Sequence, residues 1–255
     1  MSRRSFRMLA AVSALSLAML LPGATSATHS WGGYHWARTS NPFTLALGDN
    51  VDSSWGSYLS TTSQDWSQSK VLDTTVVTGG TRPRNCRATT GRVEVCNASY
   101  GNTGWLGVAS ISITSGLHIT QGTVKVNDTY FNTAQYNTSA WRNLVMCQEV
   151  GHTLGLDHQD TNFDNANLGT CMDYTRDPST NQHPNKHDYD ELVTIYTHLD
   201  STTTIGQSVR SASPASAPAA SAFGRLVSSS RDGKVQTFVR EIRAGELQVS
   251  FVIWA

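Results

Sequence analysis

The chain has 255 residues and no formal net charge, with 19 basic and 19 acidic side chains, and only 15% of its residues are charged. A neutral chain with so few charges has no electrostatic reason to bind nucleic acid or an acidic membrane surface, which excludes those classes of protein. Its length is sufficient for one domain with a substantial core and some additional segments.

Residues 1–27 have the pattern of an export signal. Three arginines within the first seven residues precede an apolar run from about Leu9 to Leu21, and small residues follow at 24–27. The run is shorter than the about 20 apolar residues that cross a membrane, so we expect no stable membrane span. The two adjacent arginines fit either the twin-arginine route or the ordinary route, and both predict a secreted, extracellular protein, in a bacterial source.

Strand and helix patterns alternate over residues 28–199, the predicted main domain. An amphipathic helix is expected at 53–67, where large apolar residues recur at helical intervals, and a closing helix at about 184–196. The expected strands are 43–47, 74–78, 106–114 and 119–126, together with a hairpin between Cys86 and Cys96.

A further helix is expected from about 140 to 154. Ser139 can cap its N-terminus, and Trp141, Leu144 and Gln148 recur at helical spacing with no proline in the segment. The second half of this helix carries the most informative pattern of the chain.

That pattern is Gln148-Glu149-x-x-His152-x-x-Gly155-x-x-His158, a zinc-peptidase signature with glutamine in place of its first histidine. Positions 148 and 152 lie one helical turn apart and present two ligands to one metal ion. Glu149 would reach a water bound to that ion. Gly155 can end the helix with little conformational strain, and the chain can then turn back so that His158 becomes a third ligand.

The signature and the downstream run Cys171-Met172-Asp173-Tyr174 resemble the metzincin clan of zinc endopeptidases. A glutamine-first signature is known in its gametolysin-like branch. The resemblance implies an α+β fold with a twisted mixed five-stranded sheet, an active-site helix, a C-terminal helix and a small β-rich tail. It also implies that Met172 lies beneath the metal and that Tyr174 helps to stabilise the oxyanion.

This resemblance implies a secreted zinc metalloendopeptidase, a monomer acting on a protein or peptide substrate. Gln148, His152 and His158 would hold Zn²⁺, and Glu149 would be general base and then acid. A glutamine oxygen is neutral but a poorer zinc donor, so another divalent metal is possible. The alternative is a catalytically inactive metzincin-like pseudoprotease that acts as an extracellular binding or adhesion protein.

Four cysteines in an exported chain predict two disulfides. Three pairings are possible. Cys86 and Cys96 flank a turn and would face each other across the expected hairpin, which leaves Cys147 with Cys171. The second bridge would join the metal-binding helix to the methionine turn. Buried free thiols are the alternative.

Two segments have alternative interpretations. By the same resemblance, 104–109 lies at the edge of the sheet, where its backbone could pair with an extended peptide substrate; it could equally be an ordinary core strand. Residues 200–222 have the composition of a linker, and 223–255 a tail whose strands 235–240 and 247–254 would form a hairpin turned at 244–245. The tail either packs on the domain or is a small attachment module.

The other histidines are expected to be surface or hydrogen-bonded residues, although His183 or His187 is a possible auxiliary metal ligand. They are His29, His35, His118, His183, His187 and His198.

Overall fold

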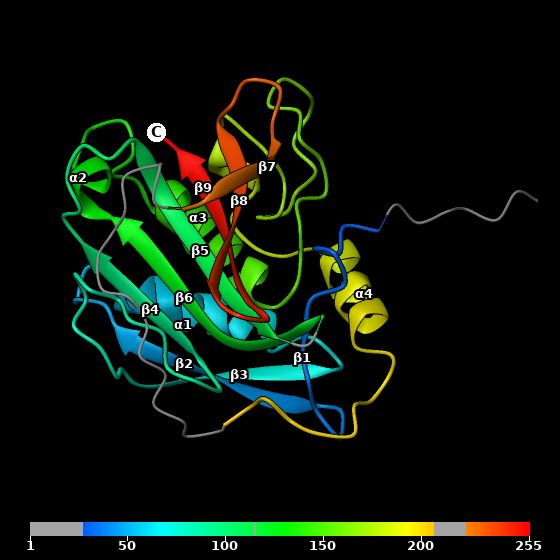
Figure 1. Ribbon diagram of the computed structural model, residues 1–255. Helices are drawn as coiled ribbons and strands as arrows, with labels where there is room; N and C mark the ends of the chain where they lie inside the picture. The colour runs from blue at the N-terminus through cyan, green and yellow to red at the C-terminus, as the bar shows by residue number, and fades with distance from the viewer. Residues whose placement is uncertain (1–27, 115, 207–222) are drawn as a thin grey trace, which may run out of the picture.

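The computed structural model describes residues 28–114, 116–206 and 223–255. The predicted export signal, 1–27, and most of the predicted linker, 207–222, lie outside the described residues. Within the described part the fold is α+β, with one mixed sheet and a few helices (Figure 1).

Along the described chain, two strands and one helix are followed by four strands, then by the remaining helices, and three strands come last. The helices are α1 (Gly56–Trp66), α2 (Asp128–Phe131), α3 (Ser139–Thr153) and α4 (Lys186–Ile195), with a 3₁₀ turn at Pro178–Thr180. The strands are β1 (His35–Trp36), β2 (Phe43–Asn50), β3 (Leu72–Thr78), β4 (Val93–Ala98), β5 (Trp105–Thr114), β6 (His118–Asn127), β7 (Arg225–Ser229), β8 (Val235–Arg243) and β9 (Glu246–Trp254).

Within the described residues the sheet has nine strands, so the predicted count of five was wrong. Eight of them follow the order β3-β2-β4-β6-β5-β9-β8-β7, and β1 pairs with β6. The first five in this order come from the predicted main domain, with β5 antiparallel to β6 and the others parallel. The count differs because the tail adds three strands beyond β5, of which β9 pairs with β5 directly, and because β1 adds one more beside β6.

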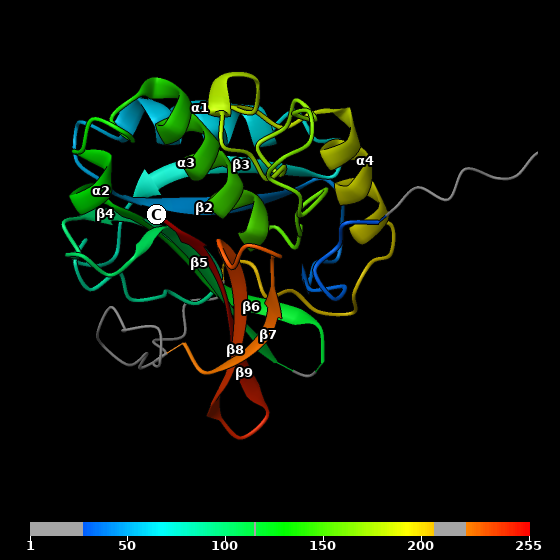
Figure 2. The ribbon, with the colours of Figure 1, turned by 90° about the horizontal axis from the view of Figure 1, so that it is seen from above.

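Helices α1 and α3 cover one face of the sheet (Figure 2). The Trp66 indole of α1 donates a hydrogen bond of 3.1 Å to the backbone oxygen of Cys147 in α3, and fixes one helix against the other. α3 begins almost where predicted, but its cap is Thr138, whose hydroxyl accepts a hydrogen bond from the Trp141 amide. Thr138 is the residue with extended backbone geometry, which a cap requires, whereas Ser139 is already helical.

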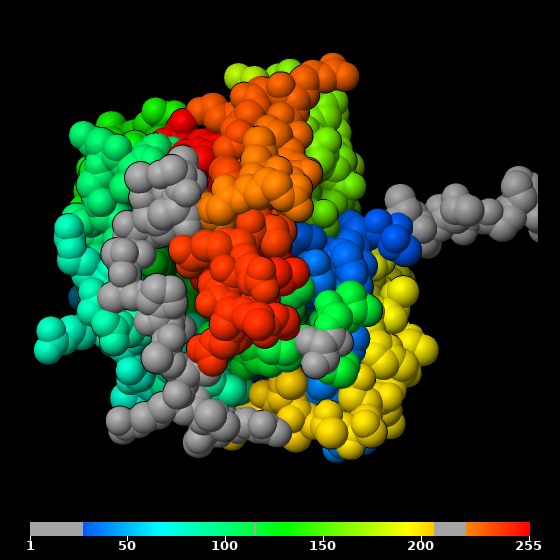
Figure 3. Space-filling view, viewed as in Figure 1, coloured from blue at the N-terminus to red at the C-terminus, as the bar shows by residue number. Residues whose placement is uncertain are grey.

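The tail is part of the sheet. As predicted, β8 and β9 form a hairpin, with Gly245 at φ +75° in its turn, where a glycine is favoured. β9 pairs with β5 antiparallel along almost its whole length, from Trp105 to Thr114. In the space-filling view the tail runs as an orange-red band over this face of the molecule (Figure 3). Of the two alternatives for the tail, packing on the domain is the observed one.

The predicted hairpin between Cys86 and Cys96 was wrong, although the two cysteines do form a disulfide. Only Cys96 lies in a strand, β4, which pairs in parallel with β2 and β6. Cys86 lies in an irregular segment at φ +44°. A disulfide needs two nearby β-carbons but not a strand pair, so the cysteine spacing alone could not predict the hairpin.

No helix within residues 28–114, 116–206 and 223–255 is long and apolar enough to span a membrane.

Candidate metal centre

Helix α3 carries three of the predicted site residues, Gln148, Glu149 and His152, all of them buried. The helix ends at Leu154, and Gly155 then takes φ +98°. A β-carbon on Gly155 would lie 2.2 Å from the backbone oxygen of Tyr34, so this reversal of the chain requires glycine. The reversal brings the next residues back alongside the helix.

The two histidines of the pattern come together at this reversal. Nε2 of His152 lies 3.2 Å from Nε2 of His158. Nδ1 of His152 lies 2.9 Å from the Leu156 carbonyl, to which it must donate, and Nδ1 of His158 lies 3.3 Å from a carboxylate oxygen of Asp157. With both Nδ1 atoms assigned as donors, the two Nε2 lone pairs face each other. Two ligands of one tetrahedral zinc lie about this far apart, so the pair fits a shared metal ion.

Burial favours the neutral form of both imidazoles. Burial lowers the pKa of His152 well below its ordinary value, and His158 lowers it further. Burial likewise lowers the pKa of His158, against the opposing effect of Asp157. Neutral imidazoles are the form that binds metals.

Gln148 lies one turn before His152 on α3, so both side chains leave the same face of the helix. It is only 4% exposed, which is unusual for a glutamine. Its carbonyl oxygen is the third available donor of the pattern.

Glu149 is fully buried, and neither of its carboxylate oxygens has a hydrogen-bond partner of normal geometry. Burial raises its pKa well above the ordinary value, and the backbone amide of Ala109 in β5 offsets only part of that effect. A β-carbon on Gly107 of β5 would lie 2.4 Å from this carboxylate. Burying a carboxyl group with so little hydrogen bonding costs free energy of folding. Stability therefore does not explain why a glutamate lies at this position.

The methionine turn packs beneath the helix. A β-carbon on Gly151 would lie 2.6 Å from the sulfur of Met172, so Met172 and α3 touch where the helix has no side chain. The disulfide between Cys147 and Cys171 joins the same two segments. The Tyr174 ring lies 4.1 Å from that of His158, centroid to centroid. Burial raises the pKa of Tyr174, so its hydroxyl stays protonated and able to donate.

The tail covers this group of residues. The Phe251 ring, on β9, stacks on the His152 imidazole with centroids 3.9 Å apart and 14° between planes. Phe251 is itself fully buried, and His158 is only 6% exposed. Of the two alternatives for 104–109, a free sheet edge is not observed, because β5 is paired with β9. In this conformation a substrate strand cannot pair with this edge of β5, and His152 and Glu149 have no exposed surface.

A cavity of about 240 Å³ adjoins the covered centre. Gln148 and Tyr174 line its side toward the centre, Leu144 of α3 lines its wall, and Ile253 and Trp254 of β9 close it from the tail.

The remaining histidines have other partners. Nδ1 of His183 lies 2.7 Å from Asp65, and the His187 ring stacks on that of His29, with 4.8 Å between centroids. The sequence interpretation missed a different grouping, in which His35, His118 and His198 meet at Asp200. Only His198 and Asp200 are close in sequence, and a His-x-Asp pair was the only signal available.

No protein-family model and no curated protein matches the chain. Nine chains of solved structures match it, among them the following two. The structure of myroilysin is 13% identical, with a TM-score of 0.38, over 63% of this chain and 82% of that one. High choriolytic enzyme 1, a hatching enzyme zinc-protease from the medaka fish Oryzias latipes, is 10% identical, with a TM-score of 0.34, over 64% of this chain and 94% of that one. Similarity this weak carries no information about activity.

Proposed function

We propose that the protein is an exported zinc metalloendopeptidase held in a latent state by its own C-terminal hairpin. The observation that carries the proposal is the pair of inward-facing Nε2 atoms, 3.2 Å apart, together with the fully buried carboxyl group of Glu149 on the same helix as His152. Two neutral imidazoles suit zinc, and a buried acid on the same helix suits proton transfer to and from a substrate.

His152 and His158 would hold Zn²⁺ through Nε2, and Gln148 through its side-chain oxygen. Zinc bound there would polarise a peptide carbonyl and acidify a water molecule. Glu149 would take the proton from the attacking water and deliver it to the leaving amine. The protonated hydroxyl of Tyr174 would donate a hydrogen bond to the oxyanion. The neutral oxygen of Gln148 is a weaker donor than imidazole, so we expect lower zinc affinity than a three-histidine site has.

The hairpin supports the latent state. β9 pairs antiparallel with the edge of β5, and an extended peptide would bind an exposed sheet edge in the same way. Phe251 meanwhile covers one face of His152. Activity therefore requires displacement of β9 from β5, after which a peptide substrate would take its place. The uncovered cavity beside Gln148 and Tyr174 would then accept one side chain of that peptide.

The second candidate is an inactive pseudoprotease that binds other proteins outside the cell. The complete burial of the centre is the observation in its favour. The two candidates differ in what happens once the hairpin is displaced: an enzyme gains cleavage activity, whereas a pseudoprotease gains none.

The test is cleavage of a quenched fluorescent casein or gelatin substrate by the mature chain carrying Phe251→Ala, with zinc supplied. Adding Glu149→Gln to that chain should lower cleavage by about 10²- to 10⁴-fold, because the amide cannot accept the proton, while bound zinc is unchanged. Gln148→His should raise zinc affinity. Equal cleavage with and without Glu149→Gln would contradict the mechanism. If the chain carrying Phe251→Ala binds zinc but cleaves neither substrate, the protein is a pseudoprotease.

A further inference from the structure

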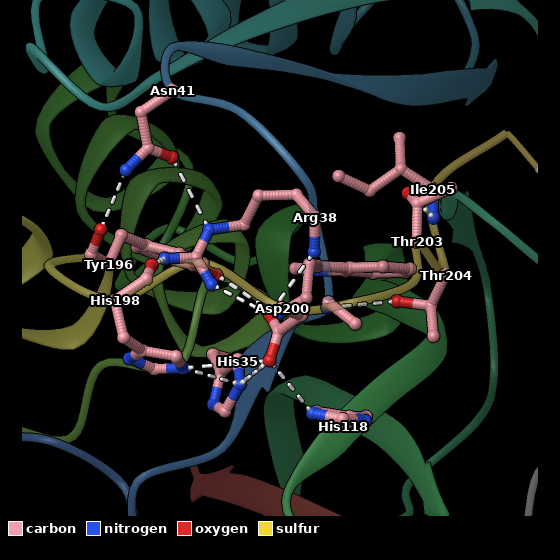
Figure 4. Close-up of polar contacts among 12 residues, drawn as sticks. His35, Arg38, Asn41, His118, Tyr196, His198, Asp200, Thr203, Thr204 and Ile205 are labelled. Carbon is pink, nitrogen blue, oxygen red and sulfur yellow. Dashed lines mark hydrogen bonds and ion pairs between the residues drawn. The ribbon is translucent and has the colours of Figure 1, made fainter.

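A second group of metal-ligating side chains lies around Asp200 and shares no residue with the candidate metal centre (Figure 4). His35 comes from β1, His198 and Asp200 from the segment after α4, and His118 from the first position of β6. The fold therefore brings His35 next to Asp200, 165 residues further along the chain, from the two ends of the main domain.

Three donor atoms in this group have the spacing of a metal site. Nε2 of His35 lies 3.1 Å from Nε2 of His198. These two nitrogens lie 3.6 Å and 3.7 Å from Oδ1 of Asp200. A tetrahedral zinc with bonds of about 2.1 Å places its ligand atoms about 3.4 Å apart, so one ion can reach all three.

In His35 and Asp200, the polar atoms that face away from the group have hydrogen-bond partners of their own. Nδ1 of His35 donates to the Gly33 carbonyl at 2.8 Å, which leaves its Nε2 lone pair directed into the group. Oδ2 of Asp200 accepts hydrogen bonds from the Arg38 side chain at 2.9 Å and from the Arg38 backbone amide at 3.2 Å, which leaves Oδ1 directed inward. Metal-binding histidines and carboxylates are oriented by outer partners of this kind.

A fourth donor and the charge of the group indicate the class of metal. Nε2 of His118 lies 3.2 Å from the same Oδ1 of Asp200, and its side chain is 32% exposed. Arg38 already neutralises the Asp200 carboxylate. Hard cations such as Ca²⁺ and Mg²⁺ need several oxygen ligands and negative charge, whereas zinc and similar metals bind neutral imidazole strongly. The donor set therefore favours zinc.

We propose that His35, His198 and Asp200 form a second zinc site. The His118 imidazole lies beside Asp200 but outside this group of three, so its side chain must rotate to supply a fourth ligand. This site is structural. It fastens β1, a strand of only two residues, to the segment that follows α4. The alternative is a metal-free network in which His198 donates to Nε2 of His35 and His118 donates to Asp200.

The test is zinc stoichiometry of the full mature chain, measured by mass spectrometry after equilibration with zinc and removal of the excess. The unsubstituted chain should bind two zinc ions. His198→Ala should lose one, because a direct ligand is gone, with affinity at that site reduced by at least about 100-fold. His198 suits this test because half of its side chain is exposed, so its removal leaves the core intact. The matched control, His183→Ala, removes an exposed histidine paired with Asp65 and should keep both ions.

A chain carrying His152→Ala and His158→Ala separates this site from the proposed catalytic one. It should still bind one zinc ion, and zinc should still raise its melting temperature, an effect that Asp200→Asn should abolish. Failure of the catalytic proposal alone leaves that single ion in place. The second site is overturned if His198→Ala leaves the stoichiometry unchanged, or if the chain without His152 and His158 binds no zinc; a metal-free network then explains the geometry.

Discussion

Truncation of Phe251 should activate the latent chain. Phe251 is fully buried against His152, and shortening a buried phenylalanine to alanine costs about 3–5 kcal/mol. If that cost falls on the docked hairpin, the population with β9 displaced rises by about 10² to 4 × 10³, at a factor of ten for each 1.4 kcal/mol or so. Cleavage of a quenched peptide by Phe251→Ala should exceed cleavage by the parent chain by about the same factor, until the open state predominates.

Phe43→Ala is the matched control, because Phe43 is also a buried phenylalanine but lies on β2 and contacts Tyr196 instead of the centre. It should lower the melting temperature to a similar extent without raising cleavage. Equal activation by both variants would mean that general loosening is responsible. No activation by Phe251→Ala, in a chain shown to bind zinc at the centre, would refute the role given to the hairpin.

Two further predictions concern the framework. Replacing Cys147 and Cys171 with serine should lower the free energy of unfolding by about 3 kcal/mol and also weaken zinc binding at the centre, because that bridge joins α3 to the methionine turn. Replacing Cys86 and Cys96 should lower the free energy of unfolding by a similar amount with no effect on zinc binding. Equal zinc affinity in the two variants would contradict this prediction. Burial lowers the pKa of Lys125 to about 8 from an unfolded value near 10.5, so the unfolded chain binds more protons between these values and stability rises with pH there. Lys125→Met should remove that rise and stabilise the protein below pH 8 by up to about 3 kcal/mol in urea unfolding; parallel stability curves for the two chains would contradict it.

Much of the local structure was predictable because it depends on neighbouring residues. The turn at Gly155 needs a backbone conformation that glycine adopts most readily, and the spacing of Gln148 and His152 is a property of any helix. The tail hairpin followed from two alternating strands around Gly245. The disulfide between Cys147 and Cys171 is likewise present as expected.

The position of the tail was not predictable, because the partner of a strand is chosen by the fold as a whole. β5 is buried along almost its entire length, which fits an edge strand covered by substrate and an interior strand equally well. Nothing in the local pattern of β9 indicates that it pairs with β5 or that Phe251 meets His152. β7 was missed because it is short and all of its residues are exposed.

The group around Asp200 was missed for a related reason. Its histidines are scattered along the chain, and each of them alone is indistinguishable from a surface histidine. Their convergence depends on the parallel pairing of β1 with β6, which puts His35 beside His118, and on the return of the chain after α4. A two-residue strand gives no periodic signal that sequence analysis can detect.

The most direct test of the central claim is an anomalous difference map at the zinc absorption edge, from crystals of the mature chain equilibrated with zinc. We predict a peak within bonding distance, about 2.1 Å, of Nε2 of both His152 and His158, with the side-chain oxygen of Gln148 as the third protein ligand. A zinc-saturated crystal with no peak there, and with the two imidazoles hydrogen-bonded directly to each other, would contradict the account.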